Sequence, residues 1–398
     1  MNNGYTNSMN KKELKIFICA GEVSGEMHGA LLMKALRSAT NIPIHFRGFG
    51  GDHMRAEGAD ILYHTDQTAA IGITPVIMKF PFFYSMAKHL KREILSWKPD
   101  LVLTIDYTGM NLRLAEFAHN HGFKTSHYVC PQVWAWHRGR IPKIGAYLDQ
   151  LLCFFPFEPE LFKDTPLRPE FIGHPLVDEV ARTFSEPRPS LPWKGRHHIA
   201  ILPGSRISEI YYLLPRMLES AVLLESSLPE ECSFIIPTPT QKMREYAEQV
   251  AATAPRLPKN MTFVDGYARH VLLQAHAAIV ASGTATLEAC MMKCPTLLVY
   301  ASNAFTAWAA RRLLTGITCL GLANIVAGHE VMPELLQDDF TPERAAQVLR
   351  RYLTDDQLRA STVHAYEETT RLLGEGNAVS RAADAILKLL SLRRSVDK

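Results

Sequence analysis

KIFICAGEVSGEMHGA, residues 15–30, joins a short apolar run to a glycine-rich turn and then to a segment with helical spacing. The run has the length of a buried strand, and the glycines allow a tight turn into the helix. Similar apolar runs, separated by longer periodic segments, follow at 44–50, 100–106 and 124–130. This βαβ rhythm predicts a parallel, doubly wound sheet covered by helices.

A proline-rich, charged passage, SEPRPSLPWKGR at 185–196, interrupts the rhythm before it starts again. The second series of apolar runs lies at 198–206, 232–238, 276–283 and 295–301. From Thr341 onward apolar residues recur at helix spacing and no strand-like run follows. The chain is therefore predicted to be an α/β protein with two facing, Rossmann-like, doubly wound domains and a helical C-terminal segment.

The length of 398 residues exceeds the size at which one hydrophobic core keeps growing, which favours two domains. The helical tail is expected to pack back on the N-terminal domain or on a partner subunit. The predicted parts are a disordered tail at 1–11, an N-terminal domain at 12–184, a linker at 185–197, a second domain at 198–340 and the helical tail at 341–398.

Composition excludes several classes of protein. A formal charge of +3, with 43 basic and 40 acidic residues spread along the chain, provides no basic field for nucleic acid. Seven cysteines occur without a CxxC pair or a histidine cluster at zinc spacing, so buried thiols in a reducing compartment are expected. No apolar run approaches the ~18–20 residues of a membrane span, and the start of the chain does not resemble a signal peptide.

ASGTATLEA, residues 281–289, has the composition of a nucleotide-diphosphate pocket. It places small residues and the hydroxyls of Ser282 and Thr284 at the start of a helix, where backbone amides favour anions. Glu288, one turn later, is placed to accept hydrogen bonds from ribose hydroxyls. A solvated helix glutamate is the alternative interpretation of that residue.

LPGSR, residues 202–206, repeats the strand-to-turn design at the start of the second domain. Gly204 and Ser205 are expected to donate to phosphate oxygens, and Arg206 supplies a positive charge suited to a leaving diphosphate. In the first glycine-rich turn both the GxGxxG spacing and a Walker lysine are missing, which argues against NAD and P-loop sites.

LTIDYTGMN, residues 103–111, puts Asp106 at the end of an apolar strand, the edge at which α/β sheets hold their chemistry. A carboxylate there is a candidate general base toward a substrate hydroxyl. Asp is also a favoured helix N-cap, so the sequence leaves both roles open.

KFPFFYSMAKHLKREIL, residues 79–95, combines aromatic side chains with lysine and arginine on an amphipathic helix. That combination is typical of a helix that lies in a membrane interface. An ordinary surface helix with its aromatic residues turned toward the core is the alternative.

Nine short motifs occur in order between about residue 14 and residue 390: AGEVSGE, IDYTGMN, YVCPQVWAW, FPFE, FIGHPLVD, LPGSR, ASGTATLE, LANIVAG and PELLQ. Together they resemble the lipid-A-disaccharide synthase family. The resemblance implies the two-Rossmann-domain GT-B fold and the transfer of 2,3-diacylglucosamine from UDP to 2,3-diacylglucosamine 1-phosphate, lipid X. UDP and the β-1′,6-linked disaccharide of lipid A are the implied products.

The resemblance also implies roles for individual residues. Asp106 matches the family's presumed base. The implied UDP-binding residues are Gly204, Ser205, Arg206, Ser282, Gly283, Thr284, Thr286, Glu288 and Asn324. Acceptor contacts are expected at Glu22, Ser24, Gly25 and Asn111. Membrane or acyl-chain contacts are expected at Phe80, Phe82, Phe83, Lys88, Lys91 and Arg92.

Three positions depart from the family pattern. Gly109 stands where the family usually has a second aspartate, and Pro75 stands where it has a glutamate. Neither position can carry essential chemistry in this chain. Glu26 replaces the usual aspartate and moves the carboxylate outward by one methylene, which puts the acceptor geometry near the first turn in doubt.

The expected reaction is a single inverting displacement in which Asp106 takes the proton of the acceptor hydroxyl. Arg206 and helix N-termini meet the charge on the departing UDP, so no metal or cofactor is expected. The expected location is cytoplasmic, peripheral on the inner face of the inner membrane, with a possible homodimer and no nucleic-acid partner. The alternatives are a UDP-sugar 2-epimerase-like enzyme and a peripheral membrane scaffold with a vestigial cleft.

Overall fold

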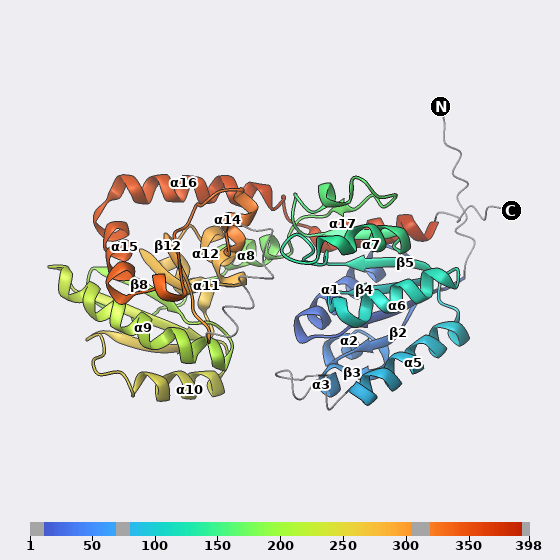
Figure 1. The fold of residues 1–398 in the computed structure, drawn as a ribbon, viewed down its shortest axis with the longest axis horizontal. Helices are drawn as coiled ribbons and strands as arrows, with labels where there is room; N and C mark the ends of the chain where they lie inside the picture. The colour runs from blue at the N-terminus through green and yellow to red at the C-terminus, as the bar shows by residue number, and fades with distance from the viewer. Residues whose placement is uncertain (1–11, 69–79, 304–318, 392–398) are drawn as a thin grey trace. The chain divides into compact units, whose positions relative to one another are not determined.

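The computed structural model describes residues 12–68, 80–303 and 319–391 (Figure 1). The chain divides into two compact units, with unit 1 formed by 1–175 and 376–398 and unit 2 formed by 176–375. The predicted disordered tail at 1–11 lies outside the described residues, as does Pro75.

Unit 1 is built on a parallel sheet of seven strands in the order β3-β2-β1-β4-β5-β6-β7. Strand β1 has β2 on one side and β4 on the other: Ile18 of β1 pairs with Gly48 of β2 and with Leu103 of β4. The order of the strands along the chain therefore reverses direction between β1 and β4. Strands β1 and β4 therefore form the switch point at which sheets of this kind bind ligands. The strands are β1 (Leu14–Ala20), β2 (Ile44–Gly50), β3 (Ala59–His64), β4 (Leu101–Ile105), β5 (Lys124–Tyr128), β6 (Gln150–Cys153) and β7 (Glu170–Phe171).

The central strands of unit 1, β1 and β4, are buried along almost their whole length because helices cover both faces. Ile16 and Ile18 pack in one core cluster with side chains of α1 and α17, whereas Phe17 and Cys19 pack in another with those of α5 and α6. Successive side chains of a strand point to opposite faces, so both sets are buried. The helices are α1 (Val23–Ser38), α2 (Asp52–Ala56), α3 (Thr65–Thr68), α5 (Phe80–Trp97), α6 (Thr108–Asn120), α7 (Ile141–Tyr147) and α17 (Ala378–Ser391), with 3₁₀ turns at Arg138–Arg140 and Pro159–Phe162.

Unit 2 repeats this design with six parallel strands in the order β10-β9-β8-β11-β12-β13. Its strands are β8 (His197–Leu202), β9 (Cys232–Thr238), β10 (Met261–Asp265), β11 (Ala277–Ala281), β12 (Thr296–Tyr300) and β13 (Glu334–Leu336). Its helices are α8 (Leu176–Ser185), α9 (Ile207–Ser227), α10 (Gln241–Ala251), α11 (Ala268–Gln274), α12 (Thr284–Met291), α14 (Leu322–Ala327), α15 (Pro342–Thr354) and α16 (Asp356–Leu372), with a 3₁₀ turn at Gln337–Asp339. The switch point lies between β8 and β11.

The boundary between the units precedes the predicted linker. Helix α8 buries Leu176 and Val180 in unit 2, so the boundary falls at Pro175. The proline-rich passage that follows α8 also packs on unit 2, since Trp193 stacks on His198 with ring centroids 4.7 Å apart. Composition alone predicts a linker there, and these contacts hold the passage against the domain.

The helical C-terminal segment is shared between the two units. Helix α15 buries its apolar face in the main core of unit 2, against α9, and α16 contacts α12 and α14. Helix α17, red in Figure 1, packs against α1 in unit 1. The Lys124 ammonium anchors its end by donating to the carbonyl of Leu389 at 2.7 Å. The predicted tail is therefore helical, and its last helix lies on the N-terminal unit.

The two parallel sheets covered by helices confirm the predicted fold class. Within the described ranges, no helix combines the length and apolar character needed to cross a membrane.

Candidate active site

The carboxyl ends of β4 and β5 carry unusual backbone conformations. Asp106 and Tyr107 have φ angles of 45° and 44°, and Val129 has a φ of 77°. Residues other than glycine rarely adopt this left-handed region, and a β-branched valine does so least readily. Strained residues of this kind cluster at functional sites, where the surrounding structure holds them in place. The strain therefore marks the edge of the unit 1 sheet near β4 and β5 as the candidate site of chemistry in unit 1.

Asp106 presents a half-buried carboxyl group at this edge, while its backbone N–H donates to the Tyr128 carbonyl at 3.0 Å. Burial raises the pKa of Asp106, whereas the Tyr107 N–H and the charge of His28 oppose that rise. The N-cap of α6 is Tyr107 and has no side-chain cap, so the alternative role of Asp106 as an N-cap is wrong. A carboxyl group with a raised pKa at a sheet edge is suited to take a proton.

The first glycine-rich turn lies against this strained turn. A side chain at Gly21 would meet the Tyr107 ring, because a Cβ there would lie 2.2 Å from the ring carbons. Glu22 is exposed at the N-cap of α1. Burial raises the pKa of Tyr107, and the charge of Glu22 raises it further. Ser24 is exposed and Gly25 is buried. Glu22 and Ser24 are therefore accessible beside the Asp106 turn.

Asn111 has a supporting position that differs from the predicted acceptor contact. Its buried amide donates to the carbonyls of Cys19, Ile105 and Asp106 at 3.1, 2.9 and 3.0 Å. These carbonyls belong to the ends of β1 and β4, so Asn111 fixes the switch point from behind. In the structure the buried Asn111 side chain holds the turn, which differs from the substrate contact that the sequence predicts.

Glu26 is also turned inward. One oxygen accepts the His53 N–H at 2.8 Å and the other accepts the Thr65 hydroxyl at 3.0 Å. The longer glutamate side chain therefore reaches the start of α2 and the residue that opens α3. Gly109 is exposed, with open space around the position of a Cβ, and provides no carboxylate at the family's second acidic position.

A group of rings beside Asp106 has no clear signal in the sequence. The His28 ring lies 5.6 Å from that of Phe154 and 6.3 Å from that of Tyr128, measured between centroids. Phe154 also contacts His174 at 5.3 Å, and burial lowers the pKa of His174 to about 4. Four segments distant in sequence supply these rings, so only the fold brings them together. His28 is the member whose charge acts on Asp106.

In unit 2, the start of α9 is occupied by the helix's own carboxylate. Glu209 Oε2 accepts the backbone N–H of Ser205 at 2.9 Å and that of Arg206 at 3.2 Å. A side chain at Gly204 would collide with this carboxylate. The Arg206 side chain is 78% exposed and contacts Glu209 Oε1 at 2.7 Å. The turn therefore offers the Arg206 guanidinium rather than the predicted amides of Ser205.

The start of α12 is open by contrast. Gly283 is its N-cap, with a φ of 152° and no side-chain cap, and both Gly283 and Thr284 are exposed. Ser282 is half-buried just before it. The Thr286 hydroxyl is buried and donates to the Gly283 carbonyl at 2.7 Å, so it shapes the turn instead of facing outward. Unpaired amides at such a helix start attract anions.

Asn324 organises a loop with all the polar atoms of its side chain. Its amide donates to the Met332 carbonyl and to Glu334, both at 2.8 Å. Its oxygen accepts the backbone N–H groups of Val331 and Met332 at 2.8 and 2.9 Å. A direct UDP contact by this buried side chain would require these bonds to break.

Glu288 is held by Arg269. Arg269 donates from Nε to Glu288 Oε1 at 2.9 Å and forms a second ion pair with Glu179. The sequence alternative of a solvated glutamate is wrong, because the Glu288 side chain is only 18% exposed. Glu288 lies one turn after the open start of α12, and its ribose contact stays a prediction.

Helix α5 packs as an ordinary amphipathic helix along one face. Met86, Leu90 and Ile94 are fully buried in unit 1. Among the predicted membrane contacts, Phe82 packs on Tyr63 at 6.2 Å, and the Lys91 ammonium lies 5.0 Å from the Phe117 ring. Phe83 is half-buried, Lys88 and Arg92 are exposed, and the Phe80 side chain lies outside the described residues.

Metal ligands can be tested only among the described residues, where Cys130, Cys153 and Glu158 bring their ligand atoms within 4.8 Å of one another. All three are buried. Glu158 already accepts the N–H groups of Phe154 and Phe155 at 3.1 and 3.0 Å. The carboxylate therefore serves the loop after β6.

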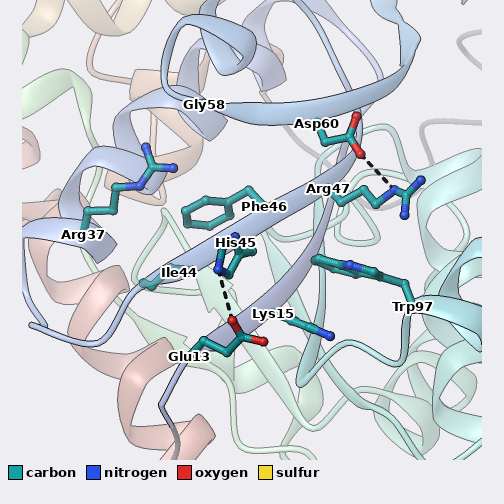
Figure 2. Close-up of a pocket in the computed structure, with 10 residues that line it drawn as sticks. All are labelled: Glu13, Lys15, Arg37, Ile44, His45, Phe46, Arg47, Gly58, Asp60 and Trp97. Atoms are coloured by element: carbon teal, nitrogen blue, oxygen red, sulfur yellow. Dashed lines mark ion pairs between the residues drawn. The ribbon is translucent and has the colours of Figure 1, made fainter.

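A pocket of about 360 Å³ lies at the opposite, amino-terminal edge of the unit 1 sheet (Figure 2). Its charged residues are largely paired, with Arg47 3.1 Å from Asp60 and His45 3.3 Å from Glu13. Parallel sheets bind their ligands at the carboxyl edge, so this pocket is not a candidate for the active site.

Comparison with known proteins gives the family. A family model described as lipid-A-disaccharide synthetase matches residues 16–389. The chain is 35% identical to the lipid-A-disaccharide synthase of Myxococcus xanthus, with 94% of this chain and 97% of that protein covered. The predicted resemblance is therefore confirmed.

Solved structures support the same fold at low sequence identity. MurG from Acinetobacter baumannii superposes with a TM-score of 0.57 at 15% identity, covering 95% of this chain and 100% of that one. A UDP-GlcNAc 2-epimerase from Neisseria meningitidis, bound to UDP-GlcNAc, gives a TM-score of 0.57 at 13% identity, with 94% and 100% covered. Such low identity shows the GT-B fold alone. The epimerase alternative is therefore supported only by a shared fold.

The match along nearly the whole chain favours the synthase over that alternative. The chain belongs to the lipid-A-disaccharide synthetase family and is a UDP-sugar-dependent glycosyltransferase.

Proposed function

We propose that the chain transfers 2,3-diacylglucosamine from UDP to the 6-hydroxyl of 2,3-diacylglucosamine 1-phosphate, with Asp106 as the general base. The family match across residues 16–389 supports the choice of UDP-sugar and lipid substrates. The observation that carries the mechanism is the strained, half-buried Asp106 at the switch point of unit 1.

In this mechanism the acceptor oxygen attacks the anomeric carbon of the donor as the bond from that carbon to UDP breaks. Asp106 receives the hydroxyl proton, and UDP leaves with the bonding electrons. Attack opposite the leaving group inverts the anomeric centre. The strained backbone, braced by Asn111, holds the carboxylate without a reorganisation step, and preorganised groups of this kind are worth most in catalysis.

The donor is assigned to unit 2, where two features suit a diphosphate. The open amides at the start of α12 and the exposed Arg206 guanidinium both favour negative charge. Glu209 already occupies the Ser205 amide, so Arg206 is assigned a role through its side chain. With these groups meeting the charge of UDP, the proposed reaction proceeds without a metal ion.

The acceptor and donor both carry acyl chains, which leads to a proposed location at the inner face of the inner membrane. The exposed part of α5 supports this location, because Lys88, Arg92 and the 66% exposed Tyr84 provide cations and an aromatic ring. Flotation with anionic vesicles tests it. Replacing Lys88 and Arg92 by glutamate should reduce the bound fraction, and equal flotation of the variant would contradict the assignment.

A homodimer is the last part of the proposal. Helix α17 packs on α1 across a large separation in sequence, which is the kind of contact that two copies can exchange. Light scattering after size-exclusion chromatography measures the mass, and a monomer at micromolar concentration would contradict the dimer.

The reaction itself is tested by supplying each substrate alone and then both together. UDP should be released only when UDP-2,3-diacylglucosamine and the acceptor are both present, and the disaccharide should appear in equal amount. Release from the donor alone would indicate hydrolysis or epimerase-like chemistry. Full turnover in the presence of a chelator such as EDTA is expected, and loss of turnover that added Mg²⁺ restores would overturn the metal-independent mechanism.

A further inference from the structure

Three charged side chains of unit 2 meet beside the open start of α12. Arg269, the second residue of α11, donates from Nε to Glu288 Oε1 at 2.9 Å. Its Nη2 donates to Glu179 Oε2 at 2.5 Å, and its Nη1 donates to the Glu179 carbonyl at 3.4 Å. Glu179 lies on α8, so one guanidinium links α8, α11 and α12.

This arrangement fixes how Glu288 presents its second oxygen. The guanidinium is planar and its donors form a rigid fork, so the bond to Oε1 sets the plane and direction of the carboxylate. Among the residues that the structure describes, no group donates a hydrogen bond to Glu288 Oε2, whereas Oε1 accepts from Arg269. An ionised carboxylate has lone pairs for several donors, which suits a pair of neighbouring hydroxyl groups.

Arg269 also maintains the charge of Glu288. Burial raises the pKa of Glu288, the hydrogen bond and charge of Arg269 lower it, and the charge of Glu179 raises it again. Removing Arg269 would leave two carboxylates facing each other with one of them largely buried, which favours protonation of Glu288. A protonated carboxyl has less acceptor capacity for a diol.

We infer that Arg269 is a positioning residue that orients Glu288 toward the ribose hydroxyls of the UDP-sugar, an inference that rests on the proposed function. Arg269 acts through Glu288 and is not assigned a contact with the substrate. Glu179 completes the arrangement by holding the far side of the guanidinium.

The test compares the binding of UDP and 2′-deoxy-UDP by calorimetry. The wild type should bind UDP about tenfold more tightly, the effect of one hydrogen bond to a charged group, and Glu288→Ala should remove this preference. Arg269→Met should also bring the ratio of the two dissociation constants close to one, while the affinity for 2′-deoxy-UDP changes less than about twofold. Arg269→Lys should restore part of the ratio.

Arg244→Met is the matched control, because Arg244 also bridges two carboxylates of unit 2, Glu248 at 2.9 Å and Asp265 at 3.0 Å. It should keep the wild-type ratio. If Arg269→Met weakens both ligands equally and keeps the ratio, Arg269 is only a structural tie and the inference is overturned.

A wild type that binds the two ligands equally would instead overturn the ribose role of Glu288, and the inference with it. That result leaves UDP release from the two substrates unaffected, so the two failures are distinguishable. If Arg269→Met does not fold, Arg269→Gln removes the charge while keeping a polar side chain, and the same ratio decides.

Discussion

The carboxyl edges of the two sheets have the same topology and different local chemistry. In unit 1 the edge holds three residues with positive φ, Asp106, Tyr107 and Val129, around a half-buried carboxyl group. In unit 2 the corresponding edge has Arg206 and Gly283 at the starts of two helices. Strain and a raised pKa favour bond making at the first edge, whereas open amides and a fixed cation favour anion binding at the second.

Within unit 2 the starts of helices α9 and α12 differ in whether a side chain caps their backbone amides. Both follow a central parallel strand, but Glu209 covers the amides of α9 while those of α12 have no side-chain cap. A turn whose sequence suits phosphate binding can thus have its backbone amides occupied by a carboxylate of the helix that follows it. The comparison predicts that changes at the edge of unit 1 alter turnover or stability and that changes at the edge of unit 2 alter UDP affinity.

The largest expected effect tests the edge of unit 1. Asp106→Asn removes the proposed base and should lower kcat by about 10²- to 10⁴-fold, the usual contribution of a general base. The Kd for UDP, measured by calorimetry, should change less than about twofold, since the proposed nucleotide site lies in unit 2. Near-normal turnover in Asp106→Asn would contradict the assignment of Asp106 as the base. A large loss of UDP affinity would contradict the proposed division between a catalytic edge in unit 1 and a nucleotide site in unit 2.

The next effect concerns Glu158, just beyond β6 at the same edge. Burial raises the pKa of this carboxyl group to about 7, although the N–H groups of Phe155 and Phe154 oppose the rise. A raised pKa in the folded state means that folding favours the protonated form, so stability is fully present below the unfolded pKa and falls as pH rises toward about 7.

Glu158→Gln keeps an acceptor but carries no charge, so the pH-dependent loss should disappear. Its free energy of unfolding, relative to wild type, should rise by about 3 kcal/mol between pH 4.5 and pH 8, the equivalent of the shift in pKa. Urea titrations at the two pH values measure the difference. Glu160→Gln, an exposed glutamate two residues away, is the control, and the same pH dependence in both variants would contradict the assignment.

The repeating order of strands and helices was the part of the fold most accessible from the sequence. The runs at 44–50 and 232–238 coincide with β2 and β9. Every residue of β9 is buried, as expected of a strand covered on both faces, whereas the exposed His45 and the half-buried Arg47 interrupt the apolar run of β2. The two-residue strand Glu170–Phe171 and the three-residue strand Glu334–Leu336 give no such signal. Their position depends on pairing with β6 and β12, which no local pattern records.

The candidate site was predictable in its location but not in the state of its side chains. The strand-to-turn motifs place Asp106 and the start of α12 at the carboxyl edges, as found. The position of a motif in the sequence could not reveal that Glu209 accepts the Ser205 amide. It also could not reveal that the Asn324 side chain forms its hydrogen bonds within its own loop. The electrostatic effect of His28 on Asp106 and the ion pair between Arg269 and Glu288 depend on the packing of elements distant in sequence.

A smaller effect tests the edge of unit 2. Arg206→Ala should raise the Kd for UDP about tenfold, because an exposed cation contributes a charge-assisted bond that solvent partly screens. Turnover at saturating donor should fall much less. Arg344→Ala is the control, since that exposed arginine of α15 pairs with Asp339 in the same unit. If calorimetry finds an unchanged Kd for UDP in Arg206→Ala, Arg206 does not contribute to UDP binding and only the start of α12 remains as the proposed anion site.

The smallest expected effect concerns His28, whose charge favours the ionised form of Asp106. His28→Phe keeps a ring against Tyr128 and Phe154 but removes that charge, so the pKa of Asp106 should rise further. The base must be ionised to accept a proton, which moves the acid limb of the kcat/KM profile to higher pH. Activity at acidic pH should drop roughly twofold to threefold, while the alkaline plateau stays unchanged.

The pH profile separates this electrostatic role from a structural one. His45→Phe changes a histidine at the opposite edge of the unit 1 sheet and should leave the acid limb in place (Figure 2). A uniform loss of activity at every pH in His28→Phe would indicate disturbed packing, and an acid limb that moves to lower pH would contradict the sign of the interaction. An upward shift that vanishes in the Asp106→Asn background would locate the coupling at the unit 1 edge, because only an ionisable residue 106 can respond to the histidine.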